Sequence, residues 1–153
     1  MVKILFVCYG NSCRSQMAEA LANRLGHGKV QASSAGTHPL GVISFDTRAV
    51  LGEKGIALHG HWSKGLEDVP VSDMDVVVEM GYGVKCKLPP DFKGQLVKWN
   101  IPDPYSLGHE YFRDVRNLIE SEVRRLLKEL EIQKAKSENG TSAVEGGGSA
   151  RES

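Results

Sequence analysis

Cys8 and Arg14 stand six positions apart near the start of the chain, in the segment CYGNSCRS, which ends at Ser15. A cysteine thiolate is a strong nucleophile, and a guanidinium can hold two oxygens of a tetrahedral anion through a planar pair of N–H groups. The spacing therefore predicts a site at which Cys8 attacks a bound oxyanion, or an ester of one, while Arg14 holds the anion.

The residues between Cys8 and Arg14 suit a loop that wraps around an anion. Gly10 and Asn11 tolerate positive φ, which lets successive backbone N–H groups converge on one centre. A positive setting favours the thiolate, the reactive form of cysteine, and the Ser15 hydroxyl can steady it by donating a hydrogen bond. We expect the substrate-binding loop residues to be Tyr9, Gly10, Asn11, Ser12, Cys13 and Ser15.

The flanking segments supply the elements that position this loop. The short apolar run Ile4–Val7 predicts a buried strand, and Gln16–Ala22, rich in strong helix formers, predicts a helix. The N-terminus of that helix adds positive potential at the loop. The alternative is that a buried cysteine and a surface arginine lie six positions apart by chance. This alternative does not explain why a strand, a loop and a helix follow one another in the order that the chemistry requires.

The stretch VCYGNSCRSQMAEAL, from Val7 to Leu21, resembles the active-site loop of the low-molecular-weight protein tyrosine phosphatase superfamily. That superfamily includes phosphatases and the thioredoxin-type arsenate reductases built on the same fold. The resemblance implies hydrolysis of a phosphotyrosine protein or a small aryl phosphate through a cysteinyl-phosphate intermediate, with no metal and no cofactor. Inorganic phosphate or arsenate would bind to the same loop.

Asp103, in the segment IPDPY, is the candidate general acid. A leaving phenolate or alkoxide needs a proton, and the flanking prolines stiffen the loop that presents this carboxyl. The resemblance agrees, because the general acid of the family occupies a matching Asp-Pro. It also implies that Tyr105 walls the cleft and stacks on a phosphotyrosine ring, and Tyr9 is a candidate for a second wall.

Arsenate reduction is the alternative activity, because arsenate mimics phosphate and fits the same loop. Reduction needs electrons from a second thiol, and the resemblance implies two further cysteines on and beyond the segment after the Val-rich strand Met74–Met80. This chain has Cys86 at about the second of these places and Glu79 or Met80 at the first, so an intramolecular relay is incomplete. Thioredoxin or a small thiol would then serve as the reductant.

Other residues divide between the two activities. Gln16 and the Ser63-Lys64 pair resemble the reductases, whereas Tyr105 resembles the phosphatases. A third reading is a binding module that holds an oxyanion without catalysis; Asp103 argues against it, because binding alone needs no proton donor.

The two remaining cysteines have open roles. Many phosphatases of the family carry a cysteine where this chain has Cys13, and the resemblance implies a reversible Cys8–Cys13 disulfide that protects the nucleophile from irreversible oxidation. Cys13 can equally be a small loop residue, and Cys86 an inert thiol rather than a redox group.

Strands alternate with helices along the chain, which predicts an α/β single domain with a four-stranded parallel sheet flanked by helices on both faces. The expected strands are Ile4–Val7, Val30–Thr37, Met74–Met80 and Gln95–Trp99; the expected helices are Gln16–Ala22, one capped by Asp46 that runs to Leu51, and one from about His109 to Ile132. Small side chains in Val30–Thr37 would let that strand lie close to the anion loop. The catalytic domain would span residues 1–132, and 133–153, poor in large apolar residues, would be a disordered tail.

Composition narrows the possible partners. The chain has 153 residues, and its 19 basic residues balance 19 acidic ones, which predicts neither nucleic-acid binding nor attachment to a membrane surface. No apolar run is long enough for a signal core or a membrane span, and three cysteines are an odd number for a disulfide framework, so we expect a cytoplasmic protein. His59 and His61 lack a third ligand nearby, so no metal site is predicted.

Overall fold

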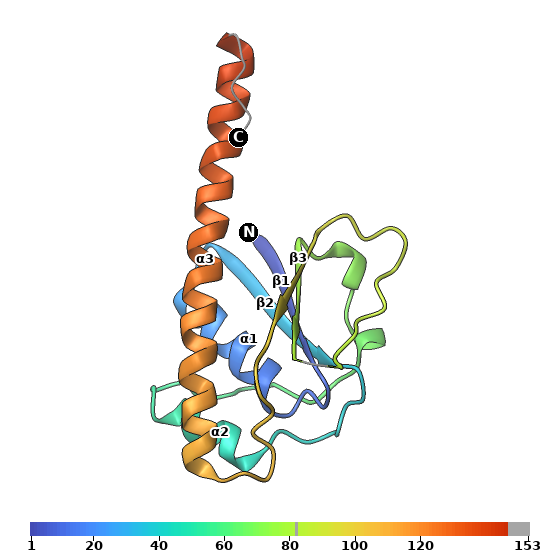
Figure 1. Ribbon diagram of the computed structural model, residues 1–153, viewed down its shortest axis with the longest axis vertical. Helices are drawn as coiled ribbons and strands as arrows, with labels where there is room; N and C mark the ends of the chain where they lie inside the picture. Colours follow the sequence, from blue (N-terminus) through green and yellow to red (C-terminus); the bar gives the residue numbers. More distant parts are fainter. Residues whose placement is uncertain (82, 147–153) are drawn as a thin grey trace.

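A four-stranded parallel sheet forms the centre of the computed structural model, which describes residues 1–81 and 83–146 (Figure 1). The strands β1 (Val2–Cys8), β2 (Val30–Gly36), β3 (Val76–Met80) and β4 (Gln95–Trp99) lie in the order β2-β1-β3-β4. All neighbouring strands are parallel, so their carboxyl ends meet at one edge. The predicted sheet is confirmed, strand for strand.

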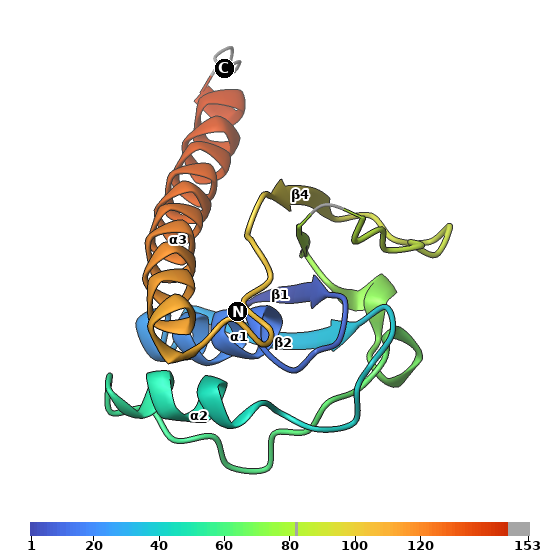
Figure 2. The same ribbon diagram turned by 60° about the horizontal axis from the view of Figure 1, so that its bottom comes forward.

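Three α-helices pack on one face of the sheet. They are α1 (Arg14–Leu25), α2 (Phe45–Gly52) and α3 (His109–Gly146), and the N-terminal part of α3 lies beside both α1 and α2 (Figure 2). The other face is covered by two single-turn 3-10 helices, η1 (Leu66–Asp68) and η2 (Val71–Asp73), and by the segment that follows β3. Both faces are therefore covered, as predicted, but α-helices account for one of them.

The central strand β1 explains why its sequence is apolar without interruption. Ile4 and Phe6 point into the core beneath the α-helices, whereas Leu5 and Val7 point into the core on the opposite face. All four side chains are fully buried. A strand covered on both faces cannot show the alternation of apolar and polar residues that marks a half-exposed strand.

Two helix ends differ from the prediction. The N-cap of α2 is Ser44, whose side chain accepts a hydrogen bond from the backbone N–H of Asp46 at 3.2 Å; Asp46, expected to be the cap, lies inside the first turn. Helix α3 continues past Ile132 to Gly146, although residues 133–138 are exposed. Residues 133–138 include Gln, Lys, Ala and Glu, which are strong helix formers, and Gln133 Oε1 accepts from Gln95 Nε2 at 3.3 Å. The boundary at residue 132 and the disordered tail stay predictions, and 147–153 lie outside the described residues.

Within the described part of the chain, none of the helices combines the length and the apolar character that crossing a membrane would require.

Candidate active site

A pocket of about 230 Å³ opens where β1 ends and α1 begins. It brings together residues that the sequence places nearly a hundred positions apart. Its lining consists of Cys8, Tyr9, Gly10, Ser12, Cys13, Arg14, Leu40, Asp103 and Tyr105. Of the predicted site residues, Asn11 and Ser15 do not line the pocket and act from behind it, and Cys86 is elsewhere. Leu40 was not predicted; an isolated leucine in a loop carries no signal in the sequence.

The backbone carbonyls of the loop are bonded on its outer side. The Tyr9 carbonyl accepts from the His38 N–H at 2.7 Å, and the Gly10 carbonyl accepts from the Ser63 hydroxyl at 3.0 Å. The Ser12 carbonyl accepts from the Thr47 hydroxyl at 2.8 Å. A tight loop whose carbonyls are held outward turns its N–H groups toward the centre, which is the arrangement that binds an oxyanion.

Strand β2 lies directly against this loop. A Cβ atom at Gly36 would be 2.7 Å from the Tyr9 carbonyl oxygen and 2.9 Å from the Asn11 backbone nitrogen. Any side chain at Gly36 would therefore push the loop away. The expectation that small residues in β2 permit a close approach is confirmed.

Asn11 is the centre of the polar network behind the loop. It is fully buried with φ +49°, and its Nδ2 donates to the hydroxyls of Ser15 at 2.8 Å and Ser34 at 2.9 Å. Its Oδ1 accepts from Gln16 Nε2 at 3.0 Å and from the Lys64 backbone N–H at 2.9 Å. Every hydrogen-bonding position of this amide is used. The sequence predicted only the positive φ.

The network leaves the Ser15 hydroxyl ready to stabilise the nucleophile. The Cys8 sulfur and the Ser15 hydroxyl oxygen are 2.9 Å apart, and either atom could be the donor. That oxygen already accepts from Asn11 Nδ2, so the Ser15 hydrogen is free to point at the sulfur. A Cys8 thiolate has no hydrogen to donate, so in that form of the site Ser15 is the donor and stabilises the charge on the sulfur.

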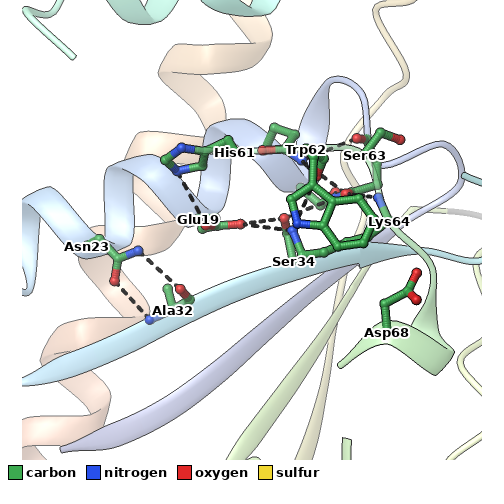
Figure 3. A network of polar contacts seen from close by, with 12 residues as sticks. Glu19, Asn23, Ala32, Ser34, His61, Trp62, Ser63, Lys64 and Asp68 are labelled. Atoms are coloured by element: carbon green, nitrogen blue, oxygen red, sulfur yellow. Dashed lines mark hydrogen bonds and ion pairs between the residues drawn. The ribbon is translucent and has the colours of Figure 1, made fainter. Parts of the chain in front are cut away.

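A carboxylate, that of Glu19, closes the network between Ser34 and His61 (Figure 3). The Ser34 hydroxyl donates to Glu19 Oε1 at 2.5 Å, and Glu19 Oε2 lies 3.4 Å from His61 Nε2. Glu19 reads as an ordinary helix former in the sequence, and Ser34 as one small strand residue among several. Their roles appear only when α1, β2 and the segment around His61 are brought together.

The Arg14 side chain is 7% exposed and points one part of its guanidinium at the pocket. Its Nη1 donates to the Met80 carbonyl at 2.9 Å and to the Ile101 carbonyl at 3.2 Å. Its Nε is buried without a hydrogen-bond partner among the described residues, and its Nη2 lies 3.7 Å from Asp103 Oδ2. The Nε and Nη2 pair is the edge of a guanidinium that suits two oxygens of one anion.

Asp103 and the two tyrosines stand at the mouth of the pocket. The Asp103 side chain is 53% exposed, and its Oδ1 accepts from the Tyr105 backbone N–H at 3.1 Å, which orients the carboxyl. Tyr9 and Tyr105 both line the pocket and are about half exposed. The Tyr9 ring stacks on His38 with a centroid distance of 4.6 Å. These aromatic faces are available to a planar ligand.

The cysteines other than Cys8 are both protonated at neutral pH. Burial raises the pKa of the Cys13 thiol, which borders the pocket, to about 11. Burial, and then the charge of Glu79, raise the pKa of the Cys86 thiol to about 11. Cys8 packs in the core beneath the α-helices, whereas Cys86 packs against the core on the opposite face of the sheet. The structure therefore does not bring Cys86 to the pocket.

Glu79 holds the segment that carries Cys86. This glutamate is buried at the end of β3, and its Oε2 accepts from the Cys86 backbone N–H at 2.7 Å.

Among residues 1–81 and 83–146, no three or more His, Cys, Asp or Glu side chains come together as candidate metal ligands.

Comparisons with known proteins agree with this geometry. A family model described as "Low molecular weight phosphotyrosine protein phosphatase" matches residues 3–136. A glutaredoxin arsenate reductase of Synechocystis sp. is 37% identical over an alignment of 138 positions, which covers 85% of this chain and 99% of that protein. The low molecular weight protein-tyrosine-phosphatase YfkJ of Bacillus subtilis is 30% identical over a gapped alignment of 156 positions, which covers 88% of this chain and 99% of that protein. A solved arsenate reductase in the phosphate binding state is 38% identical, with a TM-score of 0.75 and coverage of 84% and 98%.

Proposed function

Since the chain belongs to the low molecular weight phosphotyrosine protein phosphatase family, we propose that it hydrolyses aryl phosphate monoesters, either phosphotyrosine in a protein or a small aryl phosphate. Members of this family are cysteine-dependent phosphatases or arsenate reductases, so the choice lies between these two activities. The position of Cys86 carries the proposal. A thiol that is protonated and lies on the opposite face of the sheet from Cys8 is poorly placed to reduce an adduct on Cys8.

The first step transfers the phosphoryl group to sulfur. The Cys8 thiolate attacks phosphorus in line with the ester oxygen, forming the S–P bond as the O–P bond breaks. The loop N–H groups and the Nε and Nη2 of Arg14 stabilise the charge on the three other oxygens. Asp103, in its protonated form, gives its proton to the leaving phenolate oxygen.

The second step returns the enzyme to its starting state. Asp103, now a carboxylate, takes a proton from a water molecule that attacks the phosphorus. The S–P bond breaks, inorganic phosphate is released, and Cys8 leaves as the thiolate that Ser15 stabilises by its hydrogen bond. Cys8 is therefore the nucleophile in the first step and the leaving group in the second, and Asp103 is first the general acid and then the general base. No oxidant or reductant is needed.

The aromatic pair at the pocket mouth supports an aryl ester as substrate. Tyr9 and Tyr105 offer exposed ring faces next to the anion site, and a phenyl ring between or against them gains stacking as well as burial. Leu40, also in the lining, adds an apolar contact.

The test is hydrolysis of p-nitrophenyl phosphate in the presence of EDTA. We expect turnover by the wild type, none by Cys8→Ser, and full turnover by the control Cys86→Ser, because serine is a much weaker nucleophile and Cys86 is remote from the pocket. Absence of hydrolysis by the wild type, or equal hydrolysis by Cys8→Ser, would contradict the proposal.

Arsenate reduction remains the second candidate because of Gln16 and the 37% identity to an arsenate reductase. Gln16 Nε2 donates to the Asn11 side chain at 3.0 Å and to the Trp62 carbonyl at 3.0 Å, so this residue is part of the loop's support. In this reaction Cys8 displaces water from arsenate to form an S–As bond. A thiolate of a small thiol or of thioredoxin then attacks the Cys8 sulfur, arsenic leaves as arsenite with the two electrons of that bond, and a second thiol reduces the mixed disulfide.

Arsenite production, measured with thioredoxin or glutathione as reductant, tests this candidate. A loss of arsenite production in Cys86→Ser, with hydrolysis of aryl phosphate unchanged, would make Cys86 a resolving thiol. It would contradict the inference that Cys86 is poorly placed to reduce an adduct on Cys8. No arsenite with either reductant would remove the candidate.

Cys13 has a proposed protective role. It lies in the same loop as Cys8, and both residues line the pocket. Mild peroxide would convert Cys8 to a sulfenic acid, and condensation with Cys13 would release water and form a reversible disulfide. The test is the recovery of activity with dithiothreitol after treatment with mild peroxide. The wild type should recover its activity, and Cys13→Ser should not.

A further inference from the structure

Gly81 lies against the guanidinium of Arg14. Its φ is +148°, and a Cβ atom built at this position would be 2.3 Å from Arg14 Nη1 and 3.1 Å from the Ile101 carbonyl oxygen. The distance to Nη1 is too short for a real contact, and the distance to the carbonyl oxygen is tight. A side chain at residue 81 would therefore have to displace Arg14.

The guanidinium has little room to move without leaving its place. Nη1 is already held between the Met80 carbonyl, which directly precedes Gly81, and the Ile101 carbonyl, in the segment that leads to Asp103. The side chain is 7% exposed, so it cannot swing into solvent while its other contacts stay in place. A shift of Nη1 is transmitted through the rigid planar group to Nε and Nη2, the edge that faces the pocket.

We propose that Gly81 is a positioning residue that sets how far the Nε and Nη2 edge of Arg14 reaches toward the bound oxyanion. The absence of a side chain lets the guanidinium lie against the end of β3, with Nη1 donating to two carbonyls and Nη2, 3.7 Å from Asp103 Oδ2, on the side of the pocket. This inference rests on the proposed function only in that both use the same anion pocket. It applies equally to a phosphate ester and to arsenate.

Gly83 provides a control two positions away. Its φ is +74°, and a Cβ built there meets no atom within 4 Å. Alanine at residue 83 needs a φ near the left-handed region, whereas the φ of +148° at residue 81 is adopted almost only by glycine, and only alanine at residue 81 collides with Arg14. Gly83→Ala therefore controls for a side chain added in the same turn, and a double-mutant cycle with Arg14 separates the collision from the larger backbone strain at residue 81.

The experiment measures three quantities for these two variants and the wild type: kcat for p-nitrophenyl phosphate, the inhibition constant of inorganic phosphate, and the ratio of alkylation rates of Cys8 by iodoacetate and iodoacetamide. We expect Gly81→Ala to lower kcat by about 100-fold, as when one oxyanion donor is lost, and to raise the inhibition constant about tenfold. The preference for the anionic reagent should also fall, because it depends on the positive pocket. Gly83→Ala should stay within about threefold of the wild type in all three.

A double-mutant cycle decides whether the effect runs through Arg14. Gly81→Ala in an Arg14→Ala background should cause less than about a threefold further change, because no guanidinium remains to be displaced. If Gly81→Ala alone unfolds while the double variant folds, the collision is confirmed by stability instead. Equal losses in both backgrounds, or equal losses for Gly81→Ala and Gly83→Ala, would overturn the proposal.

The outcome for the proposed function can be read separately. If the wild type does not hydrolyse the ester, the phosphatase assignment fails, but phosphate binding (followed by protection of Cys8 from alkylation) and the reagent preference still test Gly81. If the wild type hydrolyses the ester and Gly81→Ala leaves all three quantities unchanged, only the role of Gly81 fails.

Discussion

Replacement of Asn11 should destabilise the hydrogen-bond network that supports the anion loop more than any other part of the molecule. Asn11→Gly keeps the positive φ but removes four hydrogen bonds, to Ser15, Ser34, Gln16 and Lys64. At about 1 kcal/mol net for each buried bond, the free energy of unfolding should fall by about 4 kcal/mol. Water entering the vacated space can restore some of these bonds, so we take about 2 kcal/mol as the lower limit.

Asn11→Ala adds a second cost that can be measured by difference. The residue has φ +49°, which alanine adopts at a cost of about 1 kcal/mol relative to glycine. Urea unfolding of both variants should therefore show Asn11→Ala less stable than Asn11→Gly by about 1 kcal/mol. The melting temperature of Asn11→Gly should fall by roughly 12 °C, at 2–4 °C for each kcal/mol in a chain of this size.

Asn23 is the control, because it is also an asparagine that bonds to β2. Its side chain donates to the Ala32 carbonyl at 3.1 Å and accepts from the Ala32 N–H at 2.8 Å, and both bonds go to β2 and not to the anion loop (Figure 3). Asn23→Ala should lose about 2 kcal/mol of stability with kcat within about twofold of the wild type. In Asn11→Gly, kcat should also fall, by about tenfold or more, because Ser15 is no longer held at Cys8.

A fall of less than about 1 kcal/mol in the free energy of unfolding of both Asn11 variants would refute this prediction, since the buried amide would then contribute less than a single ordinary hydrogen bond. The prediction would also be refuted if Asn23→Ala lost as much activity as Asn11→Gly, because the loss would then follow stability and not the loop.

Three other predictions concern the pocket and the helix contacts. Asp103→Asn should lower kcat for p-nitrophenyl phosphate by about 100-fold, and Cys8 should still be protected from alkylation by phosphate, because proton transfer is lost but the anion site is intact. Tyr105→Ala should raise KM for an aryl phosphate by roughly fivefold with little change for an alkyl phosphate, because one aromatic face is removed. Hydrogen bonds from Arg113, then from His109 and Arg116, hold the pKa of Glu53 below its ordinary value of 4.5. A lowered pKa stabilises the fold above pH 4.5 and the stabilisation is lost as the pH falls further, so the melting temperature should fall more steeply between pH 5 and 3 in the wild type than in Glu53→Gln.

The sequence was sufficient for the sheet and for the residues that face the pocket, with the exception of Leu40. Continuous apolar runs such as Ile4–Val7 can only be covered on both faces, and the spacing of Cys8 and Arg14 limits the loop to a few shapes. Local patterns of this kind depend on neighbours within about ten residues. They do not locate the end of α3, because residues 133–138 are exposed and show no apolar periodicity that would mark where the helix stops.

The second layer of the site could not be predicted. Glu19 and Ser34 have ordinary types for their positions in a helix and a strand, and their contacts join segments that are far apart in the chain. Gly81 is one glycine among 17, and its significance depends on where Arg14 lies in space. Interactions of this kind are set by the packing of elements and not by the local sequence.

Arg14 joins three parts of the molecule, since its Nη1 contacts the end of β3 and the segment leading to Asp103 while its other edge faces the pocket. A loss of activity on substitution of Arg14 will therefore combine weaker grip on the ligand with freer movement of the proton donor. Structural or spectroscopic measurement of the Asp103 segment in such a variant is required before kinetic defects are assigned to the missing charge.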